Sequence, residues 1–150
     1  MLGLAVISGG IILEYQIKLR KEPWNTSKQD MIIASLAPWC TSFPITNVAL
    51  SIPYAHKTST QTKALLESIK TYFTERKITL CPYPAQALQG LCQEASGATK
   101  KEVMKALAEQ YPELGQYYLK EVENKNKYYV KLFEAVGVAT LHVRKMKAGQ

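Results

Sequence analysis

The residues best able to do chemistry in this chain are basic, and its carboxylates are few. Lys and Arg number 19 against 12 Asp and Glu, and Asp30 is the single aspartate among 150 residues. Proteins hold Mg²⁺ mainly through carboxylate oxygens. We therefore expect no carboxylate-built metal site and no cofactor.

Candidate phosphate-binding residues concentrate in the second part of the chain. Residues 1–56 carry four basic and three acidic side chains, a net +1, whereas residues 57–150 carry fifteen and nine, a net +6. Basic surfaces attract polyanions such as nucleic acid, although a moderate positive charge also fits a role in solubility alone. The candidates are Lys57, Lys63, Lys100, Lys101, Arg144 and Lys145.

Two of these lysines open a predicted helix. Thr99 and Glu102 form a Thr-x-x-Glu capping box, which places Lys100 and Lys101 in the first turn. A helix N-terminus presents unpaired N–H groups and the positive end of the helix dipole. With two lysines added it can hold a phosphate. The alternative is an ordinary solvated helix start.

Other catalytic patterns have little support. His56 and His142 have no evident triad partners, and we interpret both as structural. Ser51, near Pro53, shows no nucleophile-elbow pattern, and neither a P-loop nor a Gly-x-Gly-x-x-Gly segment occurs. The three cysteines have no Cys-x-x-Cys spacing, which argues against a zinc site or disulfide framework and favours an intracellular protein with reduced thiols.

Alternating polarity predicts strands at the start of the chain. Ile11, Leu13, Tyr15 and Ile17 alternate with polar residues, so we expect one strand face to carry all four. Gly9-Gly10 separates this run from residues 2–8, and the pair suits a two-residue hairpin turn. The sequence therefore predicts a β-hairpin.

Helices and strands then follow one another. We predict a helix from Thr26 that ends before Pro38, a helix over 59–77, and one starting at Pro84 and ending near residue 95. Strands are predicted over 45–54 and 78–81, and residues 99–111 and most of 113–147 are expected to be helical. Strands separated by helices pair in parallel. The expected fold is one α/β domain over residues 1–150, with a mixed sheet and a helical last third.

Four segments in this order resemble the RuvC-type Holliday-junction resolvases, a family with an RNase H-like fold. They look like that family's opening hairpin, its central strand, its Gly-rich turn into a lysine-bearing helix, and its last helix. The segments are residues 3–7 with 11–15, then 48–54, 96–103 and 134–142.

The resemblance implies a DNA-cutting site that this chain lacks in part. The family cuts DNA with carboxylates that hold two divalent metal ions. Its first strand and aspartate would precede Gly3 and are missing here. Ser51 stands at the position of a second acid, Lys131 at that of a third, and Glu134 is the one acid retained. We therefore expect a protein that does not cut DNA.

DNA binding is better supported by the same resemblance. Lys100 matches a family lysine that faces the DNA backbone, although Gln89, Glu94 and Ser96 depart from the family pattern. The resemblance also implies a homodimer, which suits the two-fold symmetry of a four-way junction. The leading hypothesis is a non-catalytic RuvC-like protein that binds branched or duplex DNA, or is a subunit of a nucleic-acid-processing assembly.

Two other readings remain open. The first is an active Mg²⁺-dependent resolvase whose first strand lies outside this sequence. The second is a small subunit of a membrane complex, because residues 31–55 are uncharged, although three prolines argue against a span and we expect no membrane contact. Aromatic residues of the last third either stack on unpaired bases or, as we prefer, pack helices or a subunit interface. They are Tyr111, Tyr117, Tyr118, Tyr128, Tyr129 and Phe133.

Overall fold

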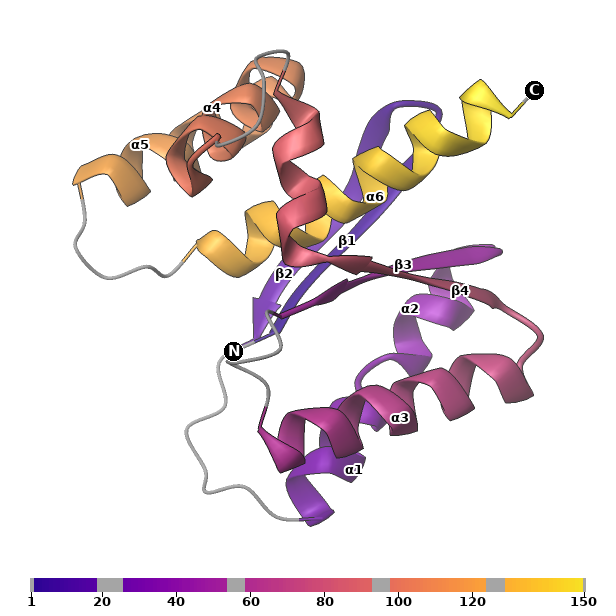
Figure 1. The fold of residues 1–150 in the computed structure, drawn as a ribbon. Helices are drawn as coiled ribbons and strands as arrows, with labels where there is room; N and C mark the ends of the chain where they lie inside the picture. Colours follow the sequence, from indigo (N-terminus) through magenta and orange to yellow (C-terminus); the bar gives the residue numbers. More distant parts are fainter. Residues whose placement is uncertain (1, 19–25, 54–58, 93–97, 124–128, 150) are drawn as a thin grey trace.

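The computed structural model describes residues 2–18, 26–53, 59–92, 98–123 and 129–149 (Figure 1). Strands and helices alternate as expected for an α/β protein. In chain order the strands are β1 (Leu2–Ser8), β2 (Ile11–Lys18), β3 (Asn47–Ile52) and β4 (Thr79–Pro84). The α-helices are α1 (Thr26–Ala34), α2 (Ala37–Ser42), α3 (Thr60–Glu75), α4 (Lys100–Gln110), α5 (Gly115–Glu123) and α6 (Val130–Ala148), and the 3₁₀ helices are η2 (Ala85–Leu91) and η3 (Pro112–Leu114).

The predicted hairpin is confirmed. β1 and β2 pair antiparallel around Gly9 and Gly10. Both glycines have positive φ, 59° and 79°, which side chains other than glycine's rarely allow. The turn is therefore of the kind that the Gly-Gly pair predicts.

The predicted side-chain alternation along β2 is wrong in its first half. Val6 pairs with Glu14 but Ile7 pairs with Ile12, so Leu13 is an extra residue, a β-bulge. The bulge shifts the alternation by one residue, and Ile12 packs on the core beside Tyr15 and Ile17. Ile11 and Leu13 are left 63% and 49% exposed.

The two later strands pair in parallel, with Asn47 opposite Thr79 and Ser51 opposite Tyr83. Strands of both orientations are thus present, as predicted. The arrangement differs in one respect from a single mixed sheet. Among the described residues the backbone ladders form two separate two-stranded sheets, β1–β2 and β3–β4.

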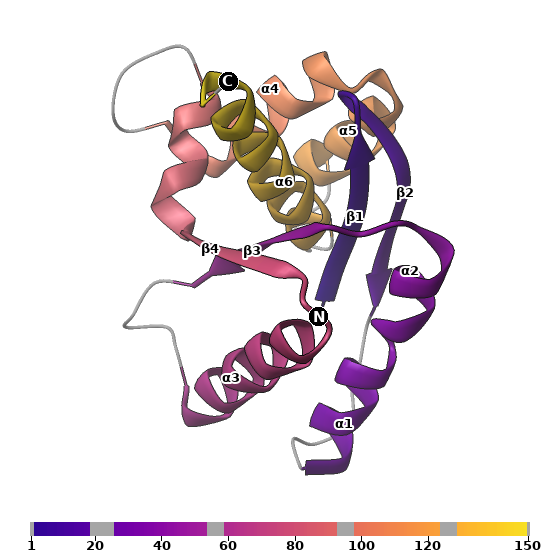
Figure 2. The same ribbon diagram turned by 90° about the vertical axis from the view of Figure 1, so that its right-hand side faces the viewer.

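Helices cover both sides of these strands. In Figures 1 and 2, α4, α5 and α6 lie on one side and α1 and α3 on the other. The larger core lies beneath α6, where Leu107, Leu114 and Val136 are almost fully buried. The smaller core lies between α2, α3 and the parallel strands and contains Leu36, Ile69 and Phe73. Since α6 packs on both β1 and β3, it joins the two sheets.

Prolines set several helix boundaries. The helix from Thr26 does end before Pro38, at Ala34, but a second helix, α2, then begins with Pro38 in its first turn. Pro84 is the N-cap of η2, which is a 3₁₀ helix rather than the predicted α-helix. Pro112 ends α4 as predicted, and the remainder forms α5 and α6.

The uncharged segment 31–55 does not form a single spanning helix. Its described part, residues 31–53, is divided among the end of α1, α2 and β3. Across the part of the chain that the structure describes, every helix is too short or too polar to cross a membrane.

Candidate nucleic-acid interface

The candidate site lies where the parallel strands end. β3 and β4 run in the same direction, and Figure 1 shows their carboxyl ends on the side of the molecule where α6 begins. Ligands of open parallel sheets bind outside the carboxyl ends of the strands. A small hollow lies here, lined by Ala85 directly after β4, by Lys100 of α4 and by Glu134 of α6. The fold thus brings two predicted site residues together.

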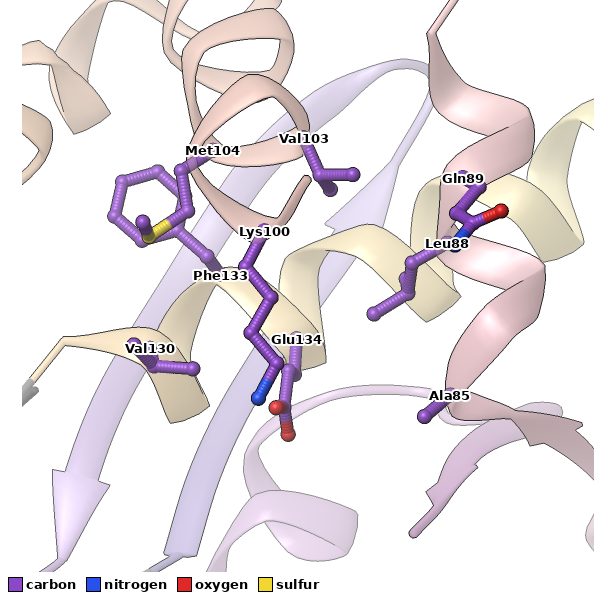
Figure 3. A pocket seen from close by; sticks show the side chains of 9 residues that line it. All are labelled: Ala85, Leu88, Gln89, Lys100, Val103, Met104, Val130, Phe133 and Glu134. Atoms are coloured by element: carbon purple, nitrogen blue, oxygen red, sulfur yellow. The ribbon is translucent and has the colours of Figure 1, made fainter. Parts of the chain in front are cut away.

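The first turn of α4 is organised by its cap. The Thr99 hydroxyl accepts a hydrogen bond from the Glu102 backbone N–H, 3.2 Å away, and also contacts the Glu102 carboxylate at 3.2 Å. The predicted N-terminus is therefore confirmed. Lys100 extends from this turn towards Glu134 across the hollow (Figure 3). Its ammonium group thus lies beside the Glu134 carboxylate at the hollow.

Apolar side chains form the floor of the hollow. Its remaining lining comes from α4, α6 and η2, and Figure 3 shows the Lys100 amine next to the Glu134 carboxylate. Apart from Lys100, Gln89 and Glu134, the side chains that line the hollow are apolar. The other lining residues are Leu88, Gln89, Val103, Met104, Val130 and Phe133.

Lys131 and Glu134 form an ion pair on the first turns of α6. The Lys131 Nζ lies 3.1 Å from Glu134 Oε2, and the side chains are 46% and 19% exposed. One helical turn separates the two residues, so the pairing follows from their spacing. The acid that the resemblance retains is therefore neutralised by the lysine that replaces its neighbour.

These residues do not fit a divalent metal centre. Magnesium needs several hard oxygen ligands. The Glu134 carboxylate is ion-paired to Lys131, and the Ser51 hydroxyl is neutral. Over the described ranges, we find no group of three or more His, Cys, Asp or Glu side chains close enough to share an ion. The donor set at this position thus lacks the negative charge that Mg²⁺ requires.

The remaining predicted DNA-binding residues are spread over other elements. Lys101 is exposed beside Lys100, and Lys63 is exposed on the first turn of α3. Arg144 lies near the end of α6, where its Nη2 donates to Gln110 Oε1 at 2.9 Å, and Lys145 is exposed next to it. Lys57 lies outside the described residues. The structure therefore brings Lys100, Lys131 and Glu134 together but not the full predicted set.

His142 has two partners, in keeping with its structural interpretation. Its Nδ1 lies 2.8 Å from the Tyr83 hydroxyl and its Nε2 lies 3.3 Å from Asn47 Oδ1. Burial raises the pKa of the Tyr83 phenol, which therefore stays protonated. Because Asn47 Oδ1 is an acceptor, Nε2–H donates to it, and the Tyr83 hydroxyl can then donate to Nδ1. His142 thereby holds α6 to both parallel strands. His56 lies outside the described residues.

The aromatic residues of the last third pack against one another and the core. Tyr111 and Phe133 are 3% and 2% exposed. The Tyr117 ring meets Tyr15 edge-on at 5.7 Å and lies 4.9 Å from the Tyr129 ring. These contacts favour the packing interpretation over base stacking. Tyr128 lies outside the described residues.

Comparison with known proteins identifies the fold. No family model matches the chain, and no curated protein does. Among solved structures, the chain is similar to Thermus thermophilus RuvC in complex with a Holliday-junction substrate, with a TM-score of 0.73 and 16% sequence identity. The match covers 98% of this chain and 87% of the other. The chain has a RuvC-like fold. The resemblance and the RNase H-like fold class inferred from the sequence are thus confirmed.

Sequence reasoning missed part of the site. Ala85 belongs to the lining because Pro84 ends β4 at the carboxyl edge and turns the chain into η2. Gln89, noted only as a departure from the family pattern, follows on the same 3₁₀ helix. Pro84, three residues after the end of the predicted strand at Cys81 and the predicted start of the next helix, was the available signal.

Proposed function

We propose that this chain is a non-catalytic RuvC-like protein that binds branched DNA through its phosphate backbone. The observation that carries the proposal is the hollow at the carboxyl edge of the parallel strands, where Lys100 faces Glu134. The similar structure, RuvC, is bound to a Holliday junction. Because the proposed ligand is DNA, the proposed location of the protein is inside the cell.

Phosphate binding is supported by the charges of this region. Lys100 and Lys101 extend from a capped helix start, whose free N–H groups favour anions. These contacts read the DNA backbone and shape rather than base identity. Affinity should therefore fall steeply as salt rises, because each phosphate contact releases counterions.

Lack of cutting is supported by the residues at the family's acid positions. Ser51 and Lys131 cannot gather two divalent ions with Glu134 as their single carboxylate partner. A family acid before Gly3 would leave these two positions unchanged. Hence the proposed activity is binding alone.

A homodimer is part of the proposal. A four-way junction has approximate two-fold symmetry, and a symmetric pair of subunits presents one site to each half. Sedimentation velocity with and without junction DNA tests this assembly. A monomer bound to the junction at saturation would contradict it.

The experiment is a binding series with labelled four-way junction, fork and plain duplex at several salt concentrations. We expect tighter binding to the junction and a log–log salt slope of about −0.9 per phosphate contacted. Lys100→Gln should weaken binding and reduce the number of phosphates contacted by about one. Equal affinity for junction and duplex would refute junction selectivity.

Lys70→Gln is the matched control, because it removes the same charge from α3. Lys70 is ion-paired to Glu67 at 3.4 Å and has no part in the hollow. Its loss should leave binding nearly unchanged. Incubation of the junction with Mg²⁺ or Mn²⁺ tests the non-catalytic part. Nicked products that disappear in Glu134→Gln would instead establish a metal-dependent endonuclease.

A further inference from the structure

The charged side chains around Glu134 carry a net positive charge. Lys131 contacts the Glu134 carboxylate directly at 3.1 Å, and Lys100 points to the same carboxylate from α4. Glu134 is only 19% exposed, so water screens its charge less than at an open surface. One ammonium group thus pairs with the carboxylate and a second points toward it, so the three side chains together carry a net charge of +1.

We propose that Lys131 takes the place of a divalent cation, so that this site binds a DNA phosphate without any metal ion. This inference rests on the proposed function, and it identifies the Lys131 ammonium as the positive charge that takes the place of the metal ion. The Lys131 ammonium neutralises Glu134 permanently, which leaves Lys100 to attract the phosphate.

The charge balance explains why Lys131 matters. With an acid at position 131 the three side chains would sum to −1, and a phosphate would be repelled unless a cation bound first. With lysine there the sum is +1, and the phosphate is attracted directly. Lys131 is also 46% exposed, so its ammonium can contact a ligand while remaining paired to Glu134.

The backbone holds this lysine in a defined place. A Cβ built on Gly3 would lie 2.1 Å from the Lys131 carbonyl oxygen, so β1 and the first turn of α6 are in backbone contact. Lys131 is also the second residue of α6, where unpaired N–H groups add to the positive potential. The cationic group is therefore fixed at the same edge of the fold as the hollow.

The first test measures metal binding alone. Calorimetric titration of the intact wild-type chain with MnCl₂ should show no saturable binding in the micromolar range. Lys131→Asp combined with Ser51→Asp restores carboxylates at two of the family's acid positions, and this variant should gain Mn²⁺ binding. Stoichiometric Mn²⁺ binding by the wild type that Glu134→Gln abolishes would overturn the proposal.

The second test measures DNA binding in EDTA and in Mg²⁺ at matched ionic strength. Wild-type affinity should change less than about twofold between the two conditions, because no phosphate contact depends on the ion. Lys131→Glu should bind about tenfold more weakly in EDTA and recover in part in Mg²⁺. Loss of wild-type binding in EDTA would overturn the proposal.

A matched variant separates charge from folding. Lys70→Glu reverses the same kind of i,i+3 ion pair on α3, away from the hollow. Lys70→Glu lowers the net charge by as much as Lys131→Glu does, but its DNA affinity should not recover when Mg²⁺ is added. Thermal unfolding shows whether both variants fold. If Lys131→Glu does not fold, Lys131→Met, which has a side chain of similar size, replaces it. If the wild type bound no DNA at all, the proposed function would fail, while the MnCl₂ titration would still decide the role of Lys131.

Discussion

Gly3 of β1 and Lys131 of α6 lie backbone against backbone. A Cβ on Gly3 would meet the Lys131 carbonyl oxygen at 2.1 Å and the Leu132 nitrogen at 3.0 Å. Both neighbours are main-chain atoms of a helix and cannot rotate aside. This contact holds the hairpin against the helix that carries Lys131 and Glu134.

Gly3→Ala should therefore force β1 and α6 apart and lower the free energy of unfolding by about 2–3 kcal/mol. Urea unfolding followed by circular dichroism measures the change. Gly115→Ala is the control, because Gly115 has helical φ and ψ and a Cβ added there would meet nothing within 4 Å. That substitution should stabilise α5 by about 0.5–1 kcal/mol. A neutral Gly3→Ala would contradict the close contact.

A buried hydroxyl pair links α6 to the end of α4. The Tyr111 hydroxyl lies 2.8 Å from Thr140 Oγ1, and Thr140 Oγ1 donates to the Val136 carbonyl at 2.8 Å. Because the single Thr140 hydrogen is used for Val136, Tyr111 must be the donor to Thr140.

Thr140→Val should cost about 1–3 kcal/mol, since it leaves the Tyr111 hydroxyl without this acceptor. Tyr111→Phe removes the donor and should cost about 1 kcal/mol. The double variant should lose less than the sum of the two, with a coupling of roughly 0.5 kcal/mol or more. Strict additivity in urea unfolding would show that the two hydroxyls do not interact.

Much of the fold is predictable from local sequence rules. Gly9-Gly10 identifies the hairpin turn, Thr99 the start of α4 and Pro112 its end. These features depend on backbone geometry and hydrogen bonds within a few residues, so short sequence windows contain them. Separation of the hairpin from the parallel strands depends on how α6 packs on both, which no local pattern encodes.

The candidate site is predictable only in part. The resemblance aligns Glu134 and Lys131 with family acid positions, and their i,i+3 spacing on one helix face accounts for the ion pair that the structure shows. The approach of Lys100 to Glu134 joins two helices 34 residues apart in the chain and depends on tertiary packing. The two partners of His142 come from β3 and β4, so these contacts also depend on tertiary packing and could not be predicted from local sequence.

The bulge at Leu13 reverses an expectation from alternation. The alternation predicts that Leu13 faces the core and Ile12 faces solvent. In the structure Ile12 packs on the core and Leu13 is half exposed. Ile12→Ala should thus cost about 1–2 kcal/mol and Leu13→Ala less than about 0.5 kcal/mol. Parallel urea titrations give both values, and the opposite ranking would mean that β2 has no bulge.

The phenol of Tyr15 should make stability depend on alkaline pH. Its hydrogen bond with Tyr117, together with burial, raises the pKa of Tyr15 to about 12 from 10.0. A raised folded pKa gives a contribution that is complete below pH 10 and is lost as the pH rises through about 12. Unfolding by urea between these pH values should show wild-type stability falling. Tyr15→Phe and Tyr117→Phe should flatten this fall, and an unchanged slope in both would contradict the assignment.

Two helix caps provide a paired test of the candidate interface. The Ser59 hydroxyl accepts from the Thr62 backbone N–H at the start of α3, and the Thr99 hydroxyl accepts from that of Glu102 at the start of α4. Each cap satisfies one N–H group that would otherwise have no partner within its helix. The two contacts are chemically alike, but only Thr99 precedes a residue that lines the hollow.

Ser59→Ala and Thr99→Ala should each lower the free energy of unfolding by about 1 kcal/mol. Their effects on DNA should differ. Without its cap the first turn of α4 frays, so Thr99→Ala should weaken junction binding by roughly fivefold or less, the factor that about 1 kcal/mol allows. Ser59→Ala should bind as the wild type does in the same anisotropy titration. Equal binding losses in both variants would show that global destabilisation, rather than the placement of Lys100, controls affinity.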